Sequence, residues 1–142
     1  AWQGKDLVSN QVPAPLFRLT DLSGESVALE DFRGKRVLLY FFAPWCKICD
    51  LSIGNLNWVR KLRSEDSTAL LAVALSYDDL QSVKSFQERN TLDVPVLLGT
   101  HEMLSSYRIR AFPTVYTVNK SGEVDGSTVG YATTLGLWWR TL

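Results

Sequence analysis

The pattern of apolar positions predicts two long strands in the middle of the chain. Residues 36–42 and 69–76 are apolar almost throughout and rich in branched or aromatic side chains, which is typical of strands covered on both faces of a sheet. Shorter apolar runs bounded by turn residues predict the other strands, including an N-terminal β-hairpin. The expected strands are residues 16–19, 27–29, 36–42, 69–76, 94–98, 114–118 and 123–129.

Helical spacing of apolar residues predicts helices between these strands. One follows Cys46 with a kink at Gly54, one follows a cap at Asp78 or Asp79, one spans 102–107, and one closes the chain. Spacing in the last helix favours core packing of its two tryptophans. The expected apolar faces are Ile48, Leu51, Leu56, Val59 and Leu62, then Leu80, Val83 and Phe86, then Leu135, Trp138, Trp139 and Leu142.

This order of elements predicts an α/β fold with a mixed central β-sheet flanked by helices, preceded by the hairpin. We expect a single domain over residues 1–142, in which residues 1–14 are an extended lead-in along the surface. Fifteen basic residues balance fifteen acidic ones, which gives no electrostatic case for binding nucleic acid. No apolar run approaches the roughly 18–20 residues of a membrane span, and no signal peptide is visible.

Both cysteines of the chain, Cys46 and Cys49, lie where a buried strand gives way to a helix. The free N–H groups and aligned dipoles of a first helical turn favour a thiolate, and Lys47 between the cysteines adds positive charge. On a helical wheel Cys49 sits at the edge of the buried face and Cys46 nearer to solvent, while Asp50 is expected to point outward. We therefore expect a redox-active disulfide in which Cys46 attacks and Cys49 resolves.

The spacing of these motifs resembles the thioredoxin fold, and within it the TlpA/ResA/DsbE-like thiol-disulfide oxidoreductases. The resemblance runs from about Pro13 to Gly130. It is carried by Pro15-x-Phe17-x-Leu19, Gly24, Leu29-x-x-Phe32-x-Gly34-Lys35, Phe42-Ala43-x-Trp45-Cys46-x-x-Cys49, Tyr107-x-Ile109-x-Ala111-Phe112-Pro113-Thr114 and Asn119-x-x-Gly122.

The resemblance implies a cis Pro113 beside the sulfurs and a Phe112 backbone that pairs with an extended substrate. We also expect Trp45 to form an apolar contact surface beside Cys46. The resemblance also implies no cofactor beyond the Cys46–Cys49 pair. The implied role is reduction of disulfides in periplasmic or other extracytoplasmic proteins, including apocytochrome c. Electrons would come from a membrane thiol donor of the DsbD/CcdA kind, and an upstream membrane anchor would have been removed.

The chain departs from this family near Cys49. Tyr40 stands where thioredoxins keep a buried aspartate that moves protons to and from the second cysteine, so we expect Tyr40 to modulate Cys49 instead. The glutamate and proline that many TlpA-like reductases carry after the second cysteine are missing, and Gly54 falls at the proline position. The proton acceptor for Cys49 therefore stays open between Tyr40, water and another residue.

Three other functions compete with the reductase. An oxidant or isomerase would use the same site, because the residues between the cysteines tune the potential. A peroxiredoxin-like peroxidase shares the lead-in pattern, but it needs a peroxidatic cysteine in a Pro, Thr/Ser and Arg pocket. A copper or zinc module would have only His101 and Met103 to add to the cysteines, whereas a structural zinc takes about four ligands.

Overall fold

The structure is a computed structural model that describes residues 7–8, 11–131 and 133–142. Two parallel strands form its centre. Strand β3 (Arg36–Phe42) pairs in register with β4 (Thr68–Ala74) from Arg36 opposite Thr68 to Phe42 opposite Ala74. The expected bounds of β3 are confirmed. Strand β4 begins and ends earlier than the apolar run at 69–76 suggests.

The remaining strands extend this pair into a mixed sheet, as predicted. They are β1 (Arg18–Asp21), β2 (Ser26–Ala28), β5 (Val96–Leu98), β6 (Thr114–Val118) and β7 (Val124–Val129). The order in the described part of the chain is β2-β1-β5-β4-β3-β6-β7. The β4–β5 pair is parallel, whereas β1 with β2, β1 with β5, β3 with β6 and β6 with β7 are antiparallel.

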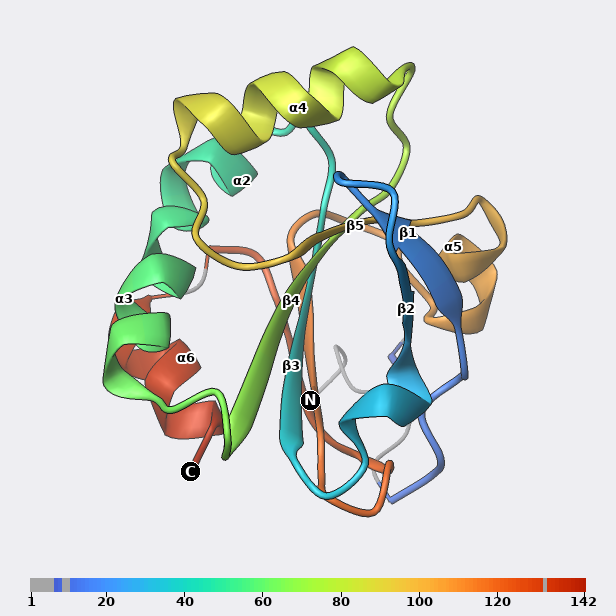
Figure 1. Cartoon of the computed structure of the whole chain (residues 1–142), viewed down its shortest axis with the longest axis vertical. Coiled ribbons are helices and arrows are strands. Elements are labelled where there is room, and N and C mark those ends of the chain that lie inside the picture. Colours follow the sequence, from blue (N-terminus) through green and yellow to red (C-terminus); the bar gives the residue numbers. More distant parts are fainter. Residues whose placement is uncertain (1–6, 9–10, 132) are drawn as a thin grey trace.

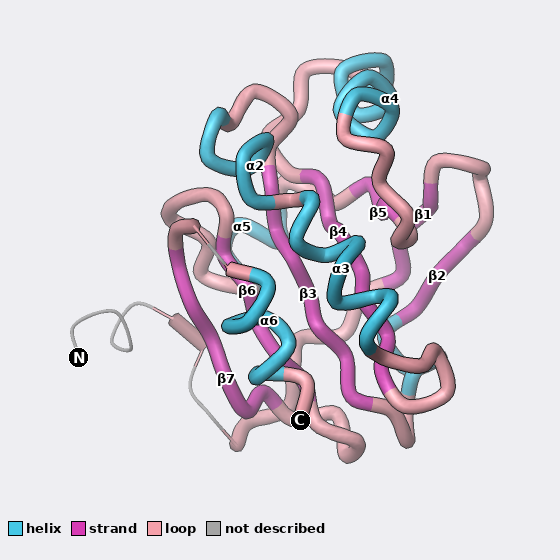
Figure 2. Tube along the Cα trace, turned by 90° about the vertical axis from the view of Figure 1, so that its left-hand side faces the viewer, coloured by secondary structure: helices cyan, strands magenta, loops and turns pink. Residues whose placement is uncertain are grey.

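Helices cover both faces of the sheet (Figure 1). They are η1 (Leu29–Phe32), α2 (Lys47–Ser52), α3 (Gly54–Leu62), α4 (Leu80–Arg89), α5 (Glu102–Ser106) and α6 (Thr134–Arg140). Helices α3 and α6 lie side by side on one face, and α5 lies on the other (Figures 1 and 2). Among the described residues, no helix is both long enough and apolar enough to cross a bilayer.

Strand β3 explains why its sequence is apolar at every position. Successive side chains of a strand point to opposite faces, so a strand covered on both sides needs apolar residues throughout. Leu38, Tyr40 and Phe42 pack in the core beneath α2, α3, α4 and α6, which also contains both cysteines. Val37, Leu39 and Phe41 pack in the second core, on the side of α5.

The helix expected after Cys46 is interrupted, and it buries a different face from the one expected. Helix α2 ends at Ser52 and α3 begins at Gly54, so the predicted kink at Gly54 is confirmed. The backbone keeps helical dihedral angles at Ile53, between the two helices, so one helical wheel still describes the segment. Its buried face is rotated from the expected one toward the side of Cys49, and Ile48, Leu51 and Leu62 are exposed. The residues that are buried along this segment are Cys49, Ser52, Ile53, Leu56 and Val59.

The last helix buries a different face from the one expected. Leu135, Trp139 and Leu142 are exposed, and only Trp138 of the two tryptophans packs partly against the core. The inward positions are Thr134, Leu137, Trp138 and Thr141, which have the predicted spacing shifted by one residue. On this face the helix meets the end of α3, where the Arg63 side chain bonds the Thr141 hydroxyl at 2.9 Å and lies over the Trp138 ring.

Helix α4 leads toward the cysteines and is capped as expected. The Asp79 side chain accepts a hydrogen bond from the Ser82 N–H at 2.8 Å. Val83 and Phe86 are buried, and Phe86 stacks on Phe42 at the end of β3, with ring centroids 4.4 Å apart. Leu80, expected on the same face, is exposed because it occupies the first turn, beyond the edge of this contact.

The lead-in is less peripheral than its polar sequence suggests. Residues 1–6, 9 and 10 of the expected segment lie outside the described part of the chain. Leu7 and Ala14 are buried, which corrects the expectation of a surface course for them. Backbone hydrogen bonds from Gln11 to Val124 and from Ala14 to Gly122 attach this segment to the β6–β7 turn.

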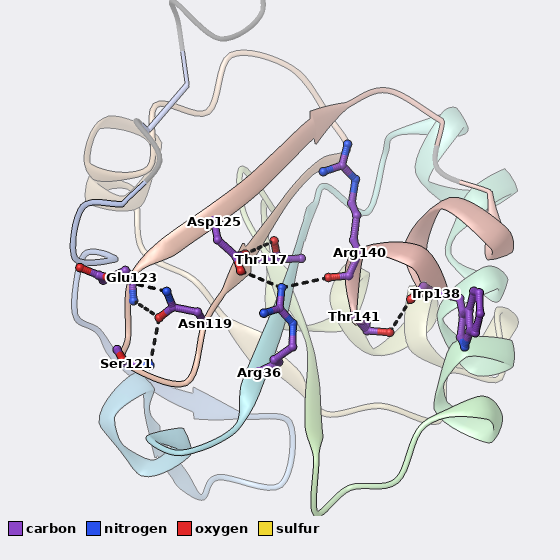
Figure 3. Close-up of polar contacts among 9 residues, drawn as sticks. All are labelled: Arg36, Thr117, Asn119, Ser121, Glu123, Asp125, Trp138, Arg140 and Thr141. Atoms are coloured by element: carbon purple, nitrogen blue, oxygen red, sulfur yellow. Dashed lines mark hydrogen bonds and ion pairs between the residues drawn. The ribbon is translucent and has the colours of Figure 1, made fainter.

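A polar cluster joins the start of β3, the end far from the cysteines, to the neighbouring elements (Figure 3). Arg36 donates to the Asp125 carboxylate at 2.8 Å and to the Arg140 carbonyl at 3.2 Å. Thr117 donates to the other oxygen of Asp125 at 2.7 Å. These contacts join β3, β6, β7 and α6.

Candidate active site

Cys46 and Cys49 lie at the junction of β3 with α2. The chain leaves β3 at Phe42, and the Cys46 N–H bonds back to the Ala43 carbonyl at 3.0 Å, which turns it into the helix. Cys46 is the N-cap of α2, and its Sγ accepts a hydrogen bond from the Cys49 N–H at 3.2 Å. Both cysteines are free thiols. The Cys46 sulfur therefore occupies the capping position where an anionic group is stabilised.

The two sulfurs differ in their environment. Cys46 retains 7% of its accessible surface, whereas Cys49 retains none. Burial raises the pKa of the Cys49 thiol well above its ordinary range, and its contact with Cys46 raises it further. The expected order of exposure, with Cys46 nearer to solvent, is confirmed.

Phe112 and Pro113 come to the site from a distant part of the chain. The Phe112–Pro113 peptide bond is cis, as the family resemblance implies, and Pro113 is buried. The Cys46 Sγ donates to the Phe112 carbonyl at 3.7 Å, a long sulfur hydrogen bond. The backbone that precedes the proline thus lies directly beside the more exposed sulfur.

Trp45 forms an exposed wall next to Cys46. Its side chain is 65% exposed, although its indole N–H bonds the Ser76 carbonyl at 2.8 Å. The indole meets the Phe112 ring edge-on, with centroids 5.8 Å apart. A large apolar surface that is both fixed and open to solvent is suited to contact with another molecule.

Tyr40 lies in the same core as Cys49, paired with a residue that we did not single out from the sequence. The hydroxyls of Tyr40 and Ser52 are hydrogen-bonded, and both residues are completely buried. Burial raises the pKa of Tyr40, an effect that the Ser52 hydrogen bond partly offsets, so its hydroxyl stays protonated. A signal for Ser52 existed, because it follows Cys49 by three residues, one helical turn along the same face.

Asp50 was expected to point freely into solvent, but its side chain is held by two residues at the end of α4. Its carboxylate receives a two-pronged ion pair from Arg89, at 2.9 and 3.0 Å, and a hydrogen bond from Asn90 at 2.8 Å. Burial pulls the pKa of Asp50 upward, but the hydrogen bonds from Arg89 and Asn90, with the charges of Arg89 and Lys47, lower it overall. Arg89 and Asn90 lie about forty residues along the chain, beyond the reach of local sequence patterns.

The other soft or basic ligand candidates lie elsewhere. Met103 is buried in the second core, across the sheet from the cysteines, and His101 is exposed at the start of α5. Within residues 7–8, 11–131 and 133–142, no group of three or more His, Cys, Asp or Glu side chains is arranged to hold a metal ion.

A dithiol at the start of a helix, beside a proline-containing loop and at the end of a central strand, defines a thiol-disulfide oxidoreductase with a thioredoxin fold. Comparison with known proteins agrees. The model of the AhpC/TSA family matches residues 11–127. ResA, a thiol-disulfide oxidoreductase of Geobacillus kaustophilus (strain HTA426), is 35% identical over 121 residues, which cover 84% of this chain and 69% of ResA.

Two solved structures extend the likeness. A thioredoxin-family thiol:disulfide interchange protein from Chlorobium tepidum TLS superposes with a TM-score of 0.83 at 24% identity, over 94% of this chain and 96% of that one, and shows the shared fold. The exposed lipoprotein thioredoxin Etrx1 of Streptococcus pneumoniae strain TIGR4 has a TM-score of 0.76 at 26% identity, over 88% and 96%. The chain belongs to the AhpC/TSA family, and like ResA it is a thiol-disulfide oxidoreductase.

Proposed function

We propose that this enzyme reduces disulfides of extracytoplasmic proteins with the Cys46–Cys49 dithiol. The observation that carries the proposal is the contrast between Cys46, a partly accessible helix cap, and Cys49, a fully buried neighbour that donates its N–H to the first sulfur. Accessibility suits Cys46 to attack an outside disulfide. Burial restricts Cys49 to a reaction within the site.

The reaction proceeds by two exchanges. The Cys46 thiolate attacks one sulfur of the substrate disulfide, the substrate S–S bond breaks, and the departing sulfur takes up a proton. Cys49 then loses its proton, and its thiolate attacks the Cys46 sulfur. This second step releases the substrate as a dithiol and leaves a Cys46–Cys49 disulfide. Two electrons pass from the enzyme to the substrate.

Trp45, Phe112 and Pro113 would hold the substrate during attack. The exposed indole of Trp45 offers apolar contact, and the Phe112 backbone beside Cys46 offers a donor and an acceptor to an extended segment. Lys47, exposed between the cysteines, would add positive charge, and Tyr40 would modulate Cys49 from within the core. The reaction needs no cofactor in this scheme.

An extracytoplasmic location is supported by the name of Etrx1, which describes an exposed lipoprotein, and by the chemistry, which suits an oxidising compartment. In the periplasm or its equivalent, oxidised enzyme would be returned to the dithiol by a membrane thiol donor of the DsbD/CcdA kind. Apocytochrome c thiols that must be reduced before haem attachment are the substrates we favour. A membrane anchor upstream of residue 1 would keep the enzyme near that donor.

The reduction potential of the Cys46–Cys49 pair tests this direction of electron flow. It is measured by equilibrating the protein with glutathione and dithiothreitol buffers. We expect a value near that of thioredoxin, about −270 mV. A value near that of DsbA, about −120 mV, would make the protein an oxidant or isomerase. A pair that cannot be cycled would eliminate the proposal and favour a copper or zinc module.

The AhpC/TSA match raises a peroxidase as the second candidate. Peroxide consumption in the presence of dithiothreitol distinguishes the two activities. We expect protein-disulfide reduction without appreciable peroxide consumption, because Cys46 follows Ala43-Pro44-Trp45 and its partner lies one helical turn away. Peroxide turnover that exceeds disulfide reduction would reverse this ranking.

A further inference from the structure

Arg89 joins the two ends of the segment that carries the dithiol. This residue ends α4, and its Nε and Nη2 bond the two carboxylate oxygens of Asp50 at 2.9 and 3.0 Å. The same Nη2 also donates to the Pro44 carbonyl at 2.9 Å. Pro44 lies two residues before Cys46, and Asp50 directly follows Cys49. The Arg89 guanidinium therefore joins the residues on the two sides of the C-x-x-C turn, and we call this set of contacts the Arg89 clip.

The clip is anchored in the core. The Arg89 guanidinium lies over the Phe86 ring at 5.1 Å, and Phe86 in turn stacks on Phe42 at the end of β3. Asn90, the C-cap of α4, donates to both the Phe86 carbonyl and the Asp50 carboxylate, at 3.0 and 2.8 Å. The forked geometry of arginine allows these contacts to be made together, which a lysine amine cannot reproduce.

Charge gives the clip a second effect. The Asp50 carboxylate lies beside Cys49, where a negative charge disfavours a thiolate, and Arg89 is its ion-pair partner. We propose that Arg89 is a positioning residue for the dithiol: it holds Pro44 and Asp50 together around Cys46 and Cys49 and neutralises the carboxylate of Asp50, which directly follows Cys49. This inference rests on the proposed function of the two cysteines.

The proposal predicts opposite effects for the two partners of the ion pair. Arg89→Gln removes the ion-pair partner of Asp50, which disfavours thiolates and therefore weakens the reduced form relative to the disulfide. Asp50→Asn leaves the Arg89 charge unopposed, which favours thiolates and the reduced form. Arg89→Gln combined with Asp50→Asn removes both charges and returns the equilibrium toward that of the unmodified protein.

The test measures the equilibrium constant for reduction of the protein by glutathione. In this reaction the protein disulfide and two glutathione thiols become the protein dithiol and one glutathione disulfide, with two electrons and two protons transferred. We expect the constant to shift by about threefold to tenfold toward the disulfide in Arg89→Gln, and by a similar factor toward the dithiol in Asp50→Asn. The equilibrium constant of the double variant should lie within about twofold of that of the unmodified protein. A double-mutant cycle of this kind measures the interaction between Arg89 and Asp50.

Arg63→Gln is the matched control, since Arg63 is a half-buried arginine at the end of α3 that bonds Thr141 rather than the active-site turn. It should leave the equilibrium unchanged. Thermal unfolding checks that each variant is folded, and Arg89→Met, which also removes the charge, replaces Arg89→Gln if the latter is not. Arg89→Lys keeps the charge and loses the fork, so its equilibrium should stay near that of the unmodified protein while its exchange rate falls severalfold.

The outcomes separate this inference from the proposed function. Single variants that shift in the same direction, or no further than Arg63→Gln, would overturn the role of Arg89 while leaving the dithiol chemistry intact. An unmodified protein that cannot be cycled with glutathione would overturn both. Opposite shifts that cancel in the double variant would support the assignment, because loss of structure alone moves both single variants the same way.

Discussion

The backbone N–H of Cys49 donates a hydrogen bond to the sulfur of Cys46, at 3.2 Å. The contact makes the first cysteine a helix cap and brings the second within one turn of it, buried below. A sulfur that receives a backbone N–H is better stabilised as a thiolate than as a thiol, because the acceptor then carries the charge. Cys46 is therefore better suited than Cys49 to act as the nucleophile.

Replacement of each cysteine by serine should have different consequences. We expect Cys46→Ser to abolish exchange with a protein disulfide, because the remaining thiol is buried. Cys49→Ser should instead accumulate a mixed disulfide between Cys46 and the substrate, because nothing resolves it. Non-reducing electrophoresis and mass spectrometry detect the adduct. Adducts on Cys49 in the Cys46→Ser protein, with normal turnover by Cys49→Ser, would reverse the two roles.

The raised pKa of Cys49 predicts that the Cys46→Ser protein loses stability in alkaline solution. The folded state holds the Cys49 proton more tightly than the unfolded state does, whose thiol titrates near about 8.5. The stabilising effect is therefore complete below about pH 8.5 and is lost as the pH rises toward the folded pKa, by up to about 1.4 kcal/mol per pH unit.

Urea unfolding between about pH 7.5 and 9 measures this slope. The protein with serine at both positions, Cys46→Ser with Cys49→Ser, is the control and should show a flatter profile. Identical profiles for the two proteins would mean that Cys49 titrates like an exposed thiol.

Tyr40→Phe should affect both stability and the second exchange. It leaves the Ser52 hydroxyl buried without its partner, which costs roughly 1–3 kcal/mol. If Tyr40 modulates Cys49, resolution of the mixed disulfide should slow severalfold, as followed by stopped-flow fluorescence. Tyr107→Phe is a matched control, since Tyr107 is equally buried but donates to the Pro15 carbonyl in the other core. Equal resolution rates in the two variants would limit Tyr40 to a structural role.

Trp45→Ala should weaken binding of protein substrates more than it affects small ones. We expect KM for a protein disulfide to rise about threefold to tenfold, because an exposed aromatic contact is lost, while reaction with a small aromatic disulfide changes little. Trp139→Ala is the control, because Trp139 is similarly exposed, at 69%, but lies on α6. Equal changes in KM for the two variants would remove Trp45 from the substrate surface.

Local patterns predicted the central elements of this fold well. The apolar run at Arg36–Phe42 is a strand with the expected bounds, and so is Thr114–Val118, because each is covered on both faces and carries its own signal. The cap at Asp79 and the break at Gly54 also depend on only a few neighbouring residues. The family resemblance supplied the cis bond before Pro113, which no local pattern implies.

Which face of a helix is buried was predicted less well. Ile48 and Leu51 were assigned to the core together with Leu56 and Val59, but the buried face of the helix is rotated toward Cys49, which leaves Ile48 and Leu51 exposed. Leu135 and Trp139 have the same spacing as the residues that are actually buried. Periodicity identifies a helix with an apolar side, but the neighbour, here α3, decides which side it packs against.

The sequence by itself determined the dithiol, its place between a strand and a helix, and the chemistry that follows, because these depend on residues within one helical turn of each other. Only the tertiary structure decided what surrounds the dithiol. Phe112 reaches Cys46, Ser52 pairs with Tyr40, and Arg89 clips Asp50 to Pro44. The longest of these contacts exist because β3, α4 and the loop before β6 meet at one end of the sheet, and no local pattern encodes that meeting.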